Sequence, residues 1–97
     1  MIMEEEIRVR TPRGKEVIGI IESLLGGNKL RVICQDNKVR ICRIPGRFRK
    51  SKWIRARDVV LVEPWTIQAE RSGDIVWRYT PTEAGWLRRK GVLKLEI

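Results

Sequence analysis

The chain has 97 residues, with 21 Lys and Arg against 12 Asp and Glu, no histidine and two cysteines. This length suits one small domain, and 42% hydrophobic with 34% charged residues supports a folded core. No apolar run approaches the roughly 20 residues of a membrane helix, and the acidic start MIMEEE is unlike a secretory signal. We therefore expect a cytoplasmic protein with no membrane partner.

The first half of the chain predicts a tail followed by three antiparallel strands. Residues 1–14 form a predicted flexible tail, because EEE and RVRTPRG show no periodicity that could pack. The segments EVIGIIESLLG, KLRVICQ and KVRICRI read as strands, separated by the turn signals GGN and DN. Gly19 inside the first of them suggests a bend or a bulge.

Alternation within these strands predicts which side chains are exposed. Leu30, Val32 and Cys34 share one side of the second strand, opposite Lys29 and Arg31. In the third strand, Val39 and Ile41 lie on one side, and Lys38 and Arg40 lie on the other. We therefore expect those two cations to join the exposed side.

The second half predicts a broken connection, two more strands and a helix. Pro45 and Gly46 end the third strand, and PGRFRKSKWIRAR is too charged for a core strand. DVVLVEPW predicts a fourth strand, and SGD is the predicted turn into IVWRY, a fifth. TPTEAGWLRRKG has capping-box spacing at its start and a Gly just past its end, which is typical of a short helix. The final VLKLEI is either a short strand or a disordered end.

The aromatic residues of this half receive separate assignments. Trp65 and Trp77 stand in or beside strands and are predicted to be core or helix-packing residues. Ile75, Trp77 and Tyr79 are predicted to share one face of the fifth strand. Trp86 is predicted to pack the helix on the sheet.

This order of elements predicts an all-β fold, a five-stranded OB barrel with a short C-terminal helix. An SH3-like barrel has a similar strand count and is the competing architecture. We divide the chain into a tail (1–14), the barrel (15–79), and the helix with a short tail (80–97). In an OB barrel, the face of the second and third strands binds oligonucleotides.

The positive charge is concentrated in one segment. Residues 38–57 contain nine cations and no anion, so the rest of the chain has 21 − 9 = 12 cations against 12 anions. One basic surface on a neutral scaffold is the electrostatic pattern of a protein that binds a polyanion.

The stretch GRFRKSKWIR, residues 46–55, places two aromatics among these cations. Cations neutralise phosphates, and exposed aromatics stack on unpaired bases, so the mixture predicts RNA binding. Whether Phe48 or Trp53 stacks, and which only anchors the loop, stays open at this point. The predicted RNA-binding residues are Lys29, Arg31, Lys38, Arg40, Arg43, Arg47, Phe48, Arg49, Lys50, Lys52, Trp53, Arg55 and Arg57.

Other chemistry is excluded or disfavoured. Cys34 and Cys42, without histidine or a CxxC pair, do not make a zinc site and read as small apolar strand residues. The sequence has no phosphate-binding loop and no carboxylate cluster outside the tail. We expect no enzyme, no metal and no cofactor.

Nearly the whole chain resembles the archaeal and eukaryotic translation initiation factor 1A family. The match includes RVICQDNKVRICRIPGRFRK, WIRARDVVLV, GDIVWRY and EAGWLRRKG. The sequence shows no long acidic C-terminal extension, and in this respect it resembles the archaeal branch of the family. The resemblance implies an S1-like OB fold and binding to ribosomal RNA in the A site of the small subunit. It also implies support for initiation-complex assembly with initiator tRNA in the P site.

The resemblance assigns RNA contact mainly to the basic loop after the third strand, here Arg47, Arg49, Lys50, Lys52, Trp53 and Arg55. It leaves contacts with other initiation factors open, and we expect a monomer. One alternative is a general single-stranded RNA binder or chaperone of the cold-shock type, although the second and third strands carry no aromatic. Another is a protein-interaction module with an acidic partner.

Overall fold

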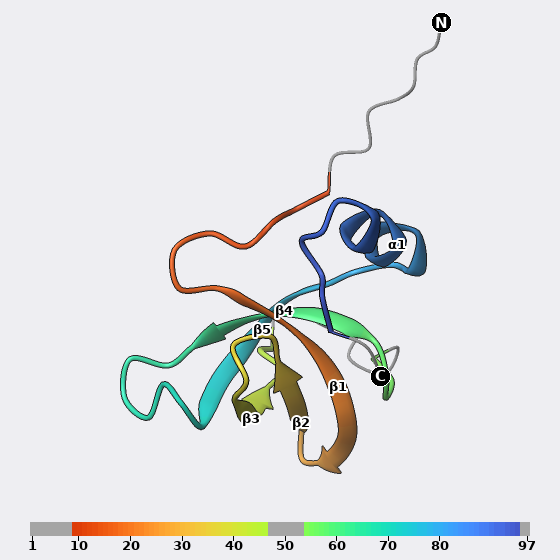
Figure 1. Cartoon of the computed structure of the whole chain (residues 1–97). Helices are drawn as coiled ribbons and strands as arrows, with labels where there is room; N and C mark the ends of the chain where they lie inside the picture. The colour runs from red at the N-terminus through yellow and green to blue at the C-terminus, as the bar shows by residue number, and fades with distance from the viewer. Residues whose placement is uncertain (1–8, 47–53, 96–97) are drawn as a thin grey trace, which may run out of the picture.

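The computed structural model describes residues 9–46 and 54–95. Its elements are β1 (Val17–Gly26), β2 (Lys29–Cys34), β3 (Val39–Arg43), β4 (Val59–Pro64), β5 (Ser72–Arg78) and α1 (Pro81–Arg89). The strands close into a barrel in the order β1-β2-β3-β5-β4, and α1 lies across one end of it (Figure 1). All pairings are antiparallel except that of β3 with β5. The five-stranded OB barrel with one short helix is therefore confirmed.

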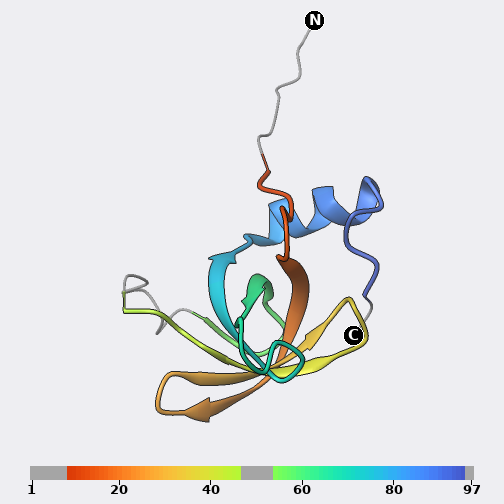
Figure 2. The same ribbon diagram turned by 90° about the vertical axis from the view of Figure 1, so that its left-hand side faces the viewer.

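Two hydrophobic clusters explain why β1 and β4 are apolar on both alternations. One cluster fills the barrel and takes Ile21 from β1 with Val60 and Val62 from β4. The other lies outside the barrel, where Ile18, Leu61 and further residues pack beneath α1. Figure 2 shows the helix seated over this side of the two strands. A strand buried on both faces needs apolar residues at successive positions, as in the sequence.

The helix begins and ends as its sequence predicts. Thr80 accepts from the backbone N–H of Glu83, and the Glu83 side chain accepts from the backbone N–H of Thr80. Pro81 occupies the start of the helix, and Gly91 adopts φ 76° just after its end. The capping box therefore stops the helix from extending into β5, and the glycine turns the chain back toward the barrel.

The chain after the helix is coil through Leu95 in the part the structure describes, and it packs rather than pairing as a strand. Leu93 is buried in the cluster under α1. The Gln35 side chain donates to the carbonyl of Val92 at 2.8 Å and accepts from the N–H of Lys94 at 2.7 Å. One amide from the end of β2 thus fixes this segment.

The described part of the predicted tail also packs, which corrects the expectation that nothing in residues 1–14 does. Val9 contacts the cluster under α1. Arg10 donates to the carbonyl of Val76 at 3.3 Å, pairs with Glu16 at 3.0 Å, and lies over the Trp77 ring at 5.8 Å. Val9 and Arg10 therefore contact the rest of the fold from within the predicted tail.

The predicted face of β3 is wrong. Arg40 and Cys42 point toward the barrel interior and are buried, whereas Val39 is exposed and Ile41 is partly so. Both alternations of VRICR contain apolar residues, so the pattern alone does not determine the face. The fold permits a buried arginine here because Asp36 and a carbonyl from another loop satisfy it, as described below.

The predicted turn at SGD is wrong as well, because β5 already begins at Ser72 and the turn lies before it. A β-bulge in the β4–β5 pairing sets Leu61 opposite Trp77 and Val62 opposite Ile75. Ile75 therefore faces the interior, while Trp77 is 37% exposed and does not belong to the core. Trp86 packs against the cluster under α1, as predicted.

Replacing Gly19 by alanine is expected to destabilise the fold by about 1–3 kcal/mol. An added Cβ would lie 2.5 Å from Cγ1 of Val32 and 3.0 Å from the carbonyl oxygen of Ile33. That oxygen belongs to the backbone of β2, which is paired with β1 at this point. Urea unfolding of the variant and the parent chain measures the difference.

Gly85→Ala is the matched control for this prediction. An added Cβ there meets only Nη1 of Arg89 at an ordinary 3.6 Å, inside α1. We expect this change to stabilise the chain by about 0.5–1 kcal/mol, because glycine weakens a helix interior. Equal unfolding midpoints for Gly19→Ala and the parent chain would contradict the close approach of β1 and β2.

Candidate nucleic-acid interface

The outer face of β2 and β3 carries exposed cations. Lys29 and Arg31 alternate with buried Leu30 and Val32 along β2, as predicted. Arg43 stands directly opposite Lys29 in the β2–β3 pairing, and both are exposed. Arg31 has one acidic neighbour, Glu22, with its Nε 3.7 Å from a carboxylate oxygen. This face is therefore cationic and open.

Arg43 is partly balanced by an anion that the fold brings from β5. Its Nε lies 3.3 Å from an oxygen of Asp74, which is its partner in the parallel β3–β5 pairing. The Arg43 side chain remains 58% exposed, so the pair leaves the guanidinium accessible. Trp65 donates its indole N–H to Asp74 at 2.9 Å, and Arg43 lies over the Trp65 ring at 5.5 Å.

Arg40 is the one predicted RNA-binding cation, among those the structure describes, that is not on the surface. It is 3% exposed. Its two terminal nitrogens donate to both oxygens of Asp36 at 3.0 and 2.9 Å, and its Nε donates to the carbonyl of Ala69 at 2.6 Å. The hydrogen bond from Arg40 lowers the pKa of Asp36 below its ordinary value. We therefore leave Arg40 out of the proposed interface.

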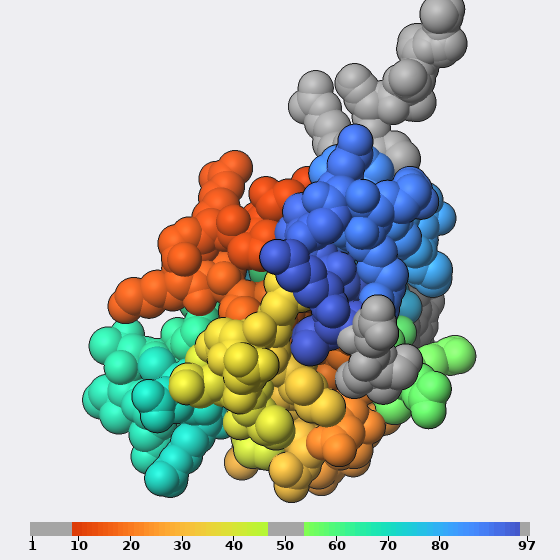
Figure 3. Space-filling view, viewed as in Figure 1, coloured from red at the N-terminus to blue at the C-terminus, as the bar shows by residue number. Residues whose placement is uncertain are grey.

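The Arg40 contacts connect two surface segments. Asp36 belongs to the turn between β2 and β3, and Ala69 belongs to the loop between β4 and β5. Figure 3 shows these two parts of the surface side by side, in yellow and turquoise. Arg40 thus fixes the loop that carries Trp65 against the cationic face.

The basic segment, residues 38–57, is anchored in the barrel core at two of its described residues. Ile44 and Ile54 belong to the interior cluster, and the N–H of Ile44 donates to the carbonyl of Asn28 at 3.0 Å. These two isoleucines also line a groove of about 320 Å³ beside the β1–β2 turn. In Figure 2, the β1–β2 turn lies on the same side of the barrel as the C-terminal end of β3. The predicted residues Arg47, Phe48, Arg49, Lys50, Lys52 and Trp53 lie outside the described residues.

A tight turn presents the last two predicted cations. Asp58 accepts from the backbone N–H of Arg55 and from Nε of Arg78, each at 2.9 Å. Arg57 adopts a left-handed φ of 77° and donates its N–H to the carbonyl of Ile21 at 2.7 Å. Arg55 and Arg57 are both exposed. This hydrogen bond to β1 holds the backbone of Arg57 in the left-handed conformation. It offsets the conformational energy that this backbone costs a residue other than glycine.

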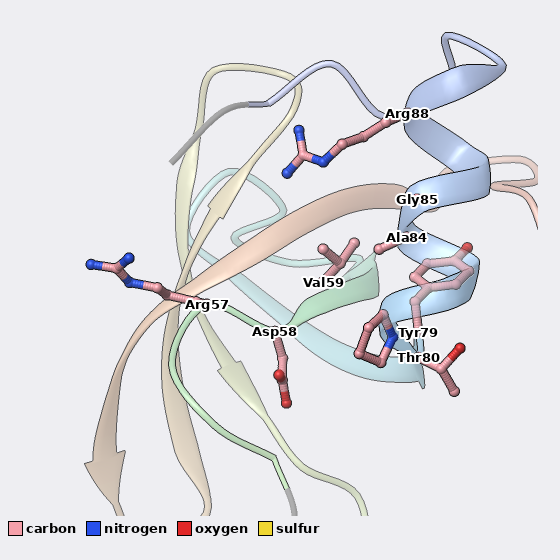
Figure 4. Close-up of a pocket in the computed structure, with 9 residues that line it drawn as sticks. Arg57, Asp58, Val59, Tyr79, Thr80, Ala84, Gly85 and Arg88 are labelled. Atoms are coloured by element: carbon pink, nitrogen blue, oxygen red, sulfur yellow. The ribbon is translucent and has the colours of Figure 1, made fainter.

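A hollow of about 330 Å³ separates the start of β4 from α1. Figure 4 shows Arg57 reaching away from the helix at one side and Arg88 reaching from α1 over the other. Arg88 donates to the carbonyl of Leu95 at 2.6 Å. Arg88 is also a basic residue in the last turn of α1, where a cation complements the helix dipole. Its approach to β4 depends on how α1 packs, which no local pattern contains.

Residues 9–46 and 54–95 hold no group of three His, Cys, Asp or Glu side chains that could bind a metal. Both cysteines are free and buried, and burial raises the pKa of Cys34 and that of Cys42, the latter to about 12. Thiols of this kind stay protonated and act as small apolar core groups. No helix in the described part of the chain is long and apolar enough to span a membrane.

Taken together, these features define an OB-fold domain with a cationic face on β2 and β3. A family model described as translation initiation factor 1A / IF-1 matches residues 4–97. The chain belongs to this family.

Individual relatives agree with the family match. Translation initiation factor 1A of Methanothermobacter thermautotrophicus is 55% identical over 92 residues, which cover 95% of this chain and 93% of the relative. Its counterpart in Pyrococcus abyssi is 47% identical over 94 residues, covering 97% and 83%. The solution structure of translation initiation factor IF-1 from the Wolbachia endosymbiont of Brugia malayi is 33% identical. The match covers 69% of this chain and 79% of that one, with a TM-score of 0.52.

These comparisons confirm the resemblance read from the residues, including its archaeal character. Family membership gives the chain a role in translation initiation, in association with the translation machinery. The relatives are initiation factors rather than enzymes.

Proposed function

We propose that the chain binds the small ribosomal subunit in the A site through ribosomal RNA and promotes initiation-complex assembly with initiator tRNA in the P site. The match of residues 4–97 to the initiation factor family is the observation that carries this proposal. The cationic outer face of β2 and β3 supports it, because phosphate contacts supply most of the affinity for RNA. The factor acts as a monomer in the cytoplasm, and other initiation factors are candidate neighbours in the complex.

The proposed mechanism is electrostatic docking followed by steric occupation. The exposed cations of the β2–β3 face, Lys29, Arg31 and Arg43, contact phosphates. The cations outside this face do the same, namely Lys38 before β3, Arg55 and Arg57 in the turn before β4, and those of residues 47–53. Phe48 or Trp53 stacks on an unpaired base. The bound barrel then fills the space that an elongator tRNA would use. No step forms or breaks a covalent bond.

Sedimentation of the chain with purified small subunits tests this function. We expect saturation at one protein per subunit and an affinity that falls steeply as salt is raised. An unstructured RNA oligonucleotide, as long as the stretch of ribosomal RNA that the chain covers, should bind the chain much more weakly than the small subunit does at the same salt concentration. Comparable affinity for the oligonucleotide would instead favour the single-stranded RNA binder considered above.

A further inference from the structure

Trp65 is placed on the surface although its sequence context predicts a core residue. It follows directly after β4 and is 39% exposed even with Arg43 over its ring. The indole is held in one orientation, because its N–H donates to Asp74 at 2.9 Å and its backbone N–H donates to the carbonyl of Ser72 at 3.1 Å. The side chain therefore presents a large, fixed, partly open aromatic surface.

This ring lies at the end of a row of charged residues that crosses three strands. Lys29 of β2 pairs with Arg43 of β3, and Arg43 pairs with Asp74 of β5, which holds Trp65. Strands β2 and β3 have no aromatic of their own, so Trp65 supplies this face with one from a neighbouring loop. Figure 3 shows that loop, in turquoise, against the β2–β3 surface.

We propose that Trp65 is a stacking platform for one unpaired base of the bound RNA, with Arg43 and Lys29 contacting the phosphates beside that base. The proposal rests on the proposed function above and adds a contact outside the basic segment. A fixed indole next to two accessible cations offers both interactions that a single-stranded nucleotide needs. An acidic peptide would use the same cations, but it would not need an oriented aromatic ring.

The test compares Trp65→Leu, Trp65→Phe and Trp77→Leu in the full chain on purified small subunits. Trp77 is the matched control, since it is 37% exposed and also lies under an arginine, Arg10, beside the N-terminal segment. We expect Trp65→Leu to weaken binding roughly 5- to 100-fold, the range for loss of one stacked base. Trp65→Phe keeps an aromatic face and should stay within about threefold of the wild type. Trp77→Leu should bind as the wild type does.

Base-specific chemical probing of the subunit RNA assigns the contact. Wild type and Trp65→Phe should protect one unpaired base that becomes reactive again with Trp65→Leu, while the protections due to the basic segment persist. Weaker binding by Trp65→Leu with an unchanged base pattern would overturn the proposal and point to a ribosomal protein. Equal binding by all variants would overturn it too. A wild-type chain that binds no subunit would instead refute the proposed function, and this contact with it.

Discussion

A variant with Arg47, Arg49, Lys50 and Lys52 replaced by alanine is expected to bind small ribosomal subunits roughly two orders of magnitude more weakly at about 0.1 M salt. These four residues belong to the 20-residue segment that accounts for the whole net charge of +9. Within this segment, Ile44 and Ile54 are buried in the barrel core. Sedimentation or fluorescence anisotropy measures the loss.

The same variant should show a weaker dependence on salt. Each phosphate contact that is lost removes about 0.7–0.9 from the slope of log affinity against log salt, so four contacts remove about 3. Thermal unfolding should stay within a few degrees of the wild type, because removing like charges from one segment relieves repulsion. An unchanged slope and affinity would contradict the role of the segment.

A control variant separates this local effect from total charge. Replacing Arg13, Lys15, Arg71 and Lys94 with alanine also lowers the net charge from +9 to +5 but leaves residues 38–57 intact. We expect it to lose less than tenfold in affinity, an order-of-magnitude limit from long-range attraction alone. Equal losses in the two variants would show that net charge, rather than the basic segment, governs binding.

Asp36→Ala is expected to destabilise the fold by about 2–3 kcal/mol and to lower the unfolding temperature by on the order of 10 °C. The change removes both carboxylate oxygens that accept from the guanidinium of Arg40, a side chain that is 3% exposed, and leaves it without a counterion there. A buried charge without its counterion is costly. We place the value below the usual range of about 3–5 kcal/mol because the Asp36 side chain is 38% exposed. Differential scanning calorimetry gives the shift.

Glu22→Ala provides the surface comparison. It removes the partner of Arg31, but both side chains of that pair are about half exposed and 3.7 Å apart. Exposed pairs contribute about 0–1 kcal/mol, so the unfolding temperature should hardly change. If Asp36→Ala lowers the unfolding temperature as little as Glu22→Ala does, the stabilising role of the buried Arg40–Asp36 pair is contradicted.

The contribution of Asp36 should also depend on pH in a defined direction. Because the hydrogen bond from Arg40 lowers the pKa of Asp36, the unfolded chain takes up a proton first as the pH falls. The stabilisation is complete above the unfolded pKa of about 3.9 and is lost as the pH falls through the lower folded value. The difference in unfolding free energy between wild type and Asp36→Ala should therefore narrow below about pH 4.

The sequence predicts the strands, the capped helix and the barrel well, because each depends on local alternation or turn chemistry. It fails at β3, where V-R-I-C-R is apolar on both sides and Ala69, one partner of buried Arg40, lies 29 residues away. It also fails at Trp77, whose orientation follows a bulge in the β4–β5 pairing, and at Trp65, which follows β4 and lies under Arg43 of β3.

The candidate interface, too, has features that the sequence predicts and others that it does not. Exposed cations on β2 follow from simple alternation with buried Leu30 and Val32. The partial balance of Arg43 by Asp74 does not, because the two meet through the parallel β3–β5 pairing that closes the barrel. Charge counting therefore overestimated the excess of positive charge on this face, and Trp65, whose indole donates to Asp74, was predicted to be a core residue.

Footprinting of the small-subunit RNA with the wild-type chain tests the central claim most directly. Hydroxyl-radical cleavage, read across the whole RNA as protein is added, reports where the backbone is covered. We predict one cluster of protections, at the A site, that appears with a single saturation curve at one protein per subunit. Protections scattered over the subunit, or saturation without any protection in the A site, would contradict the account.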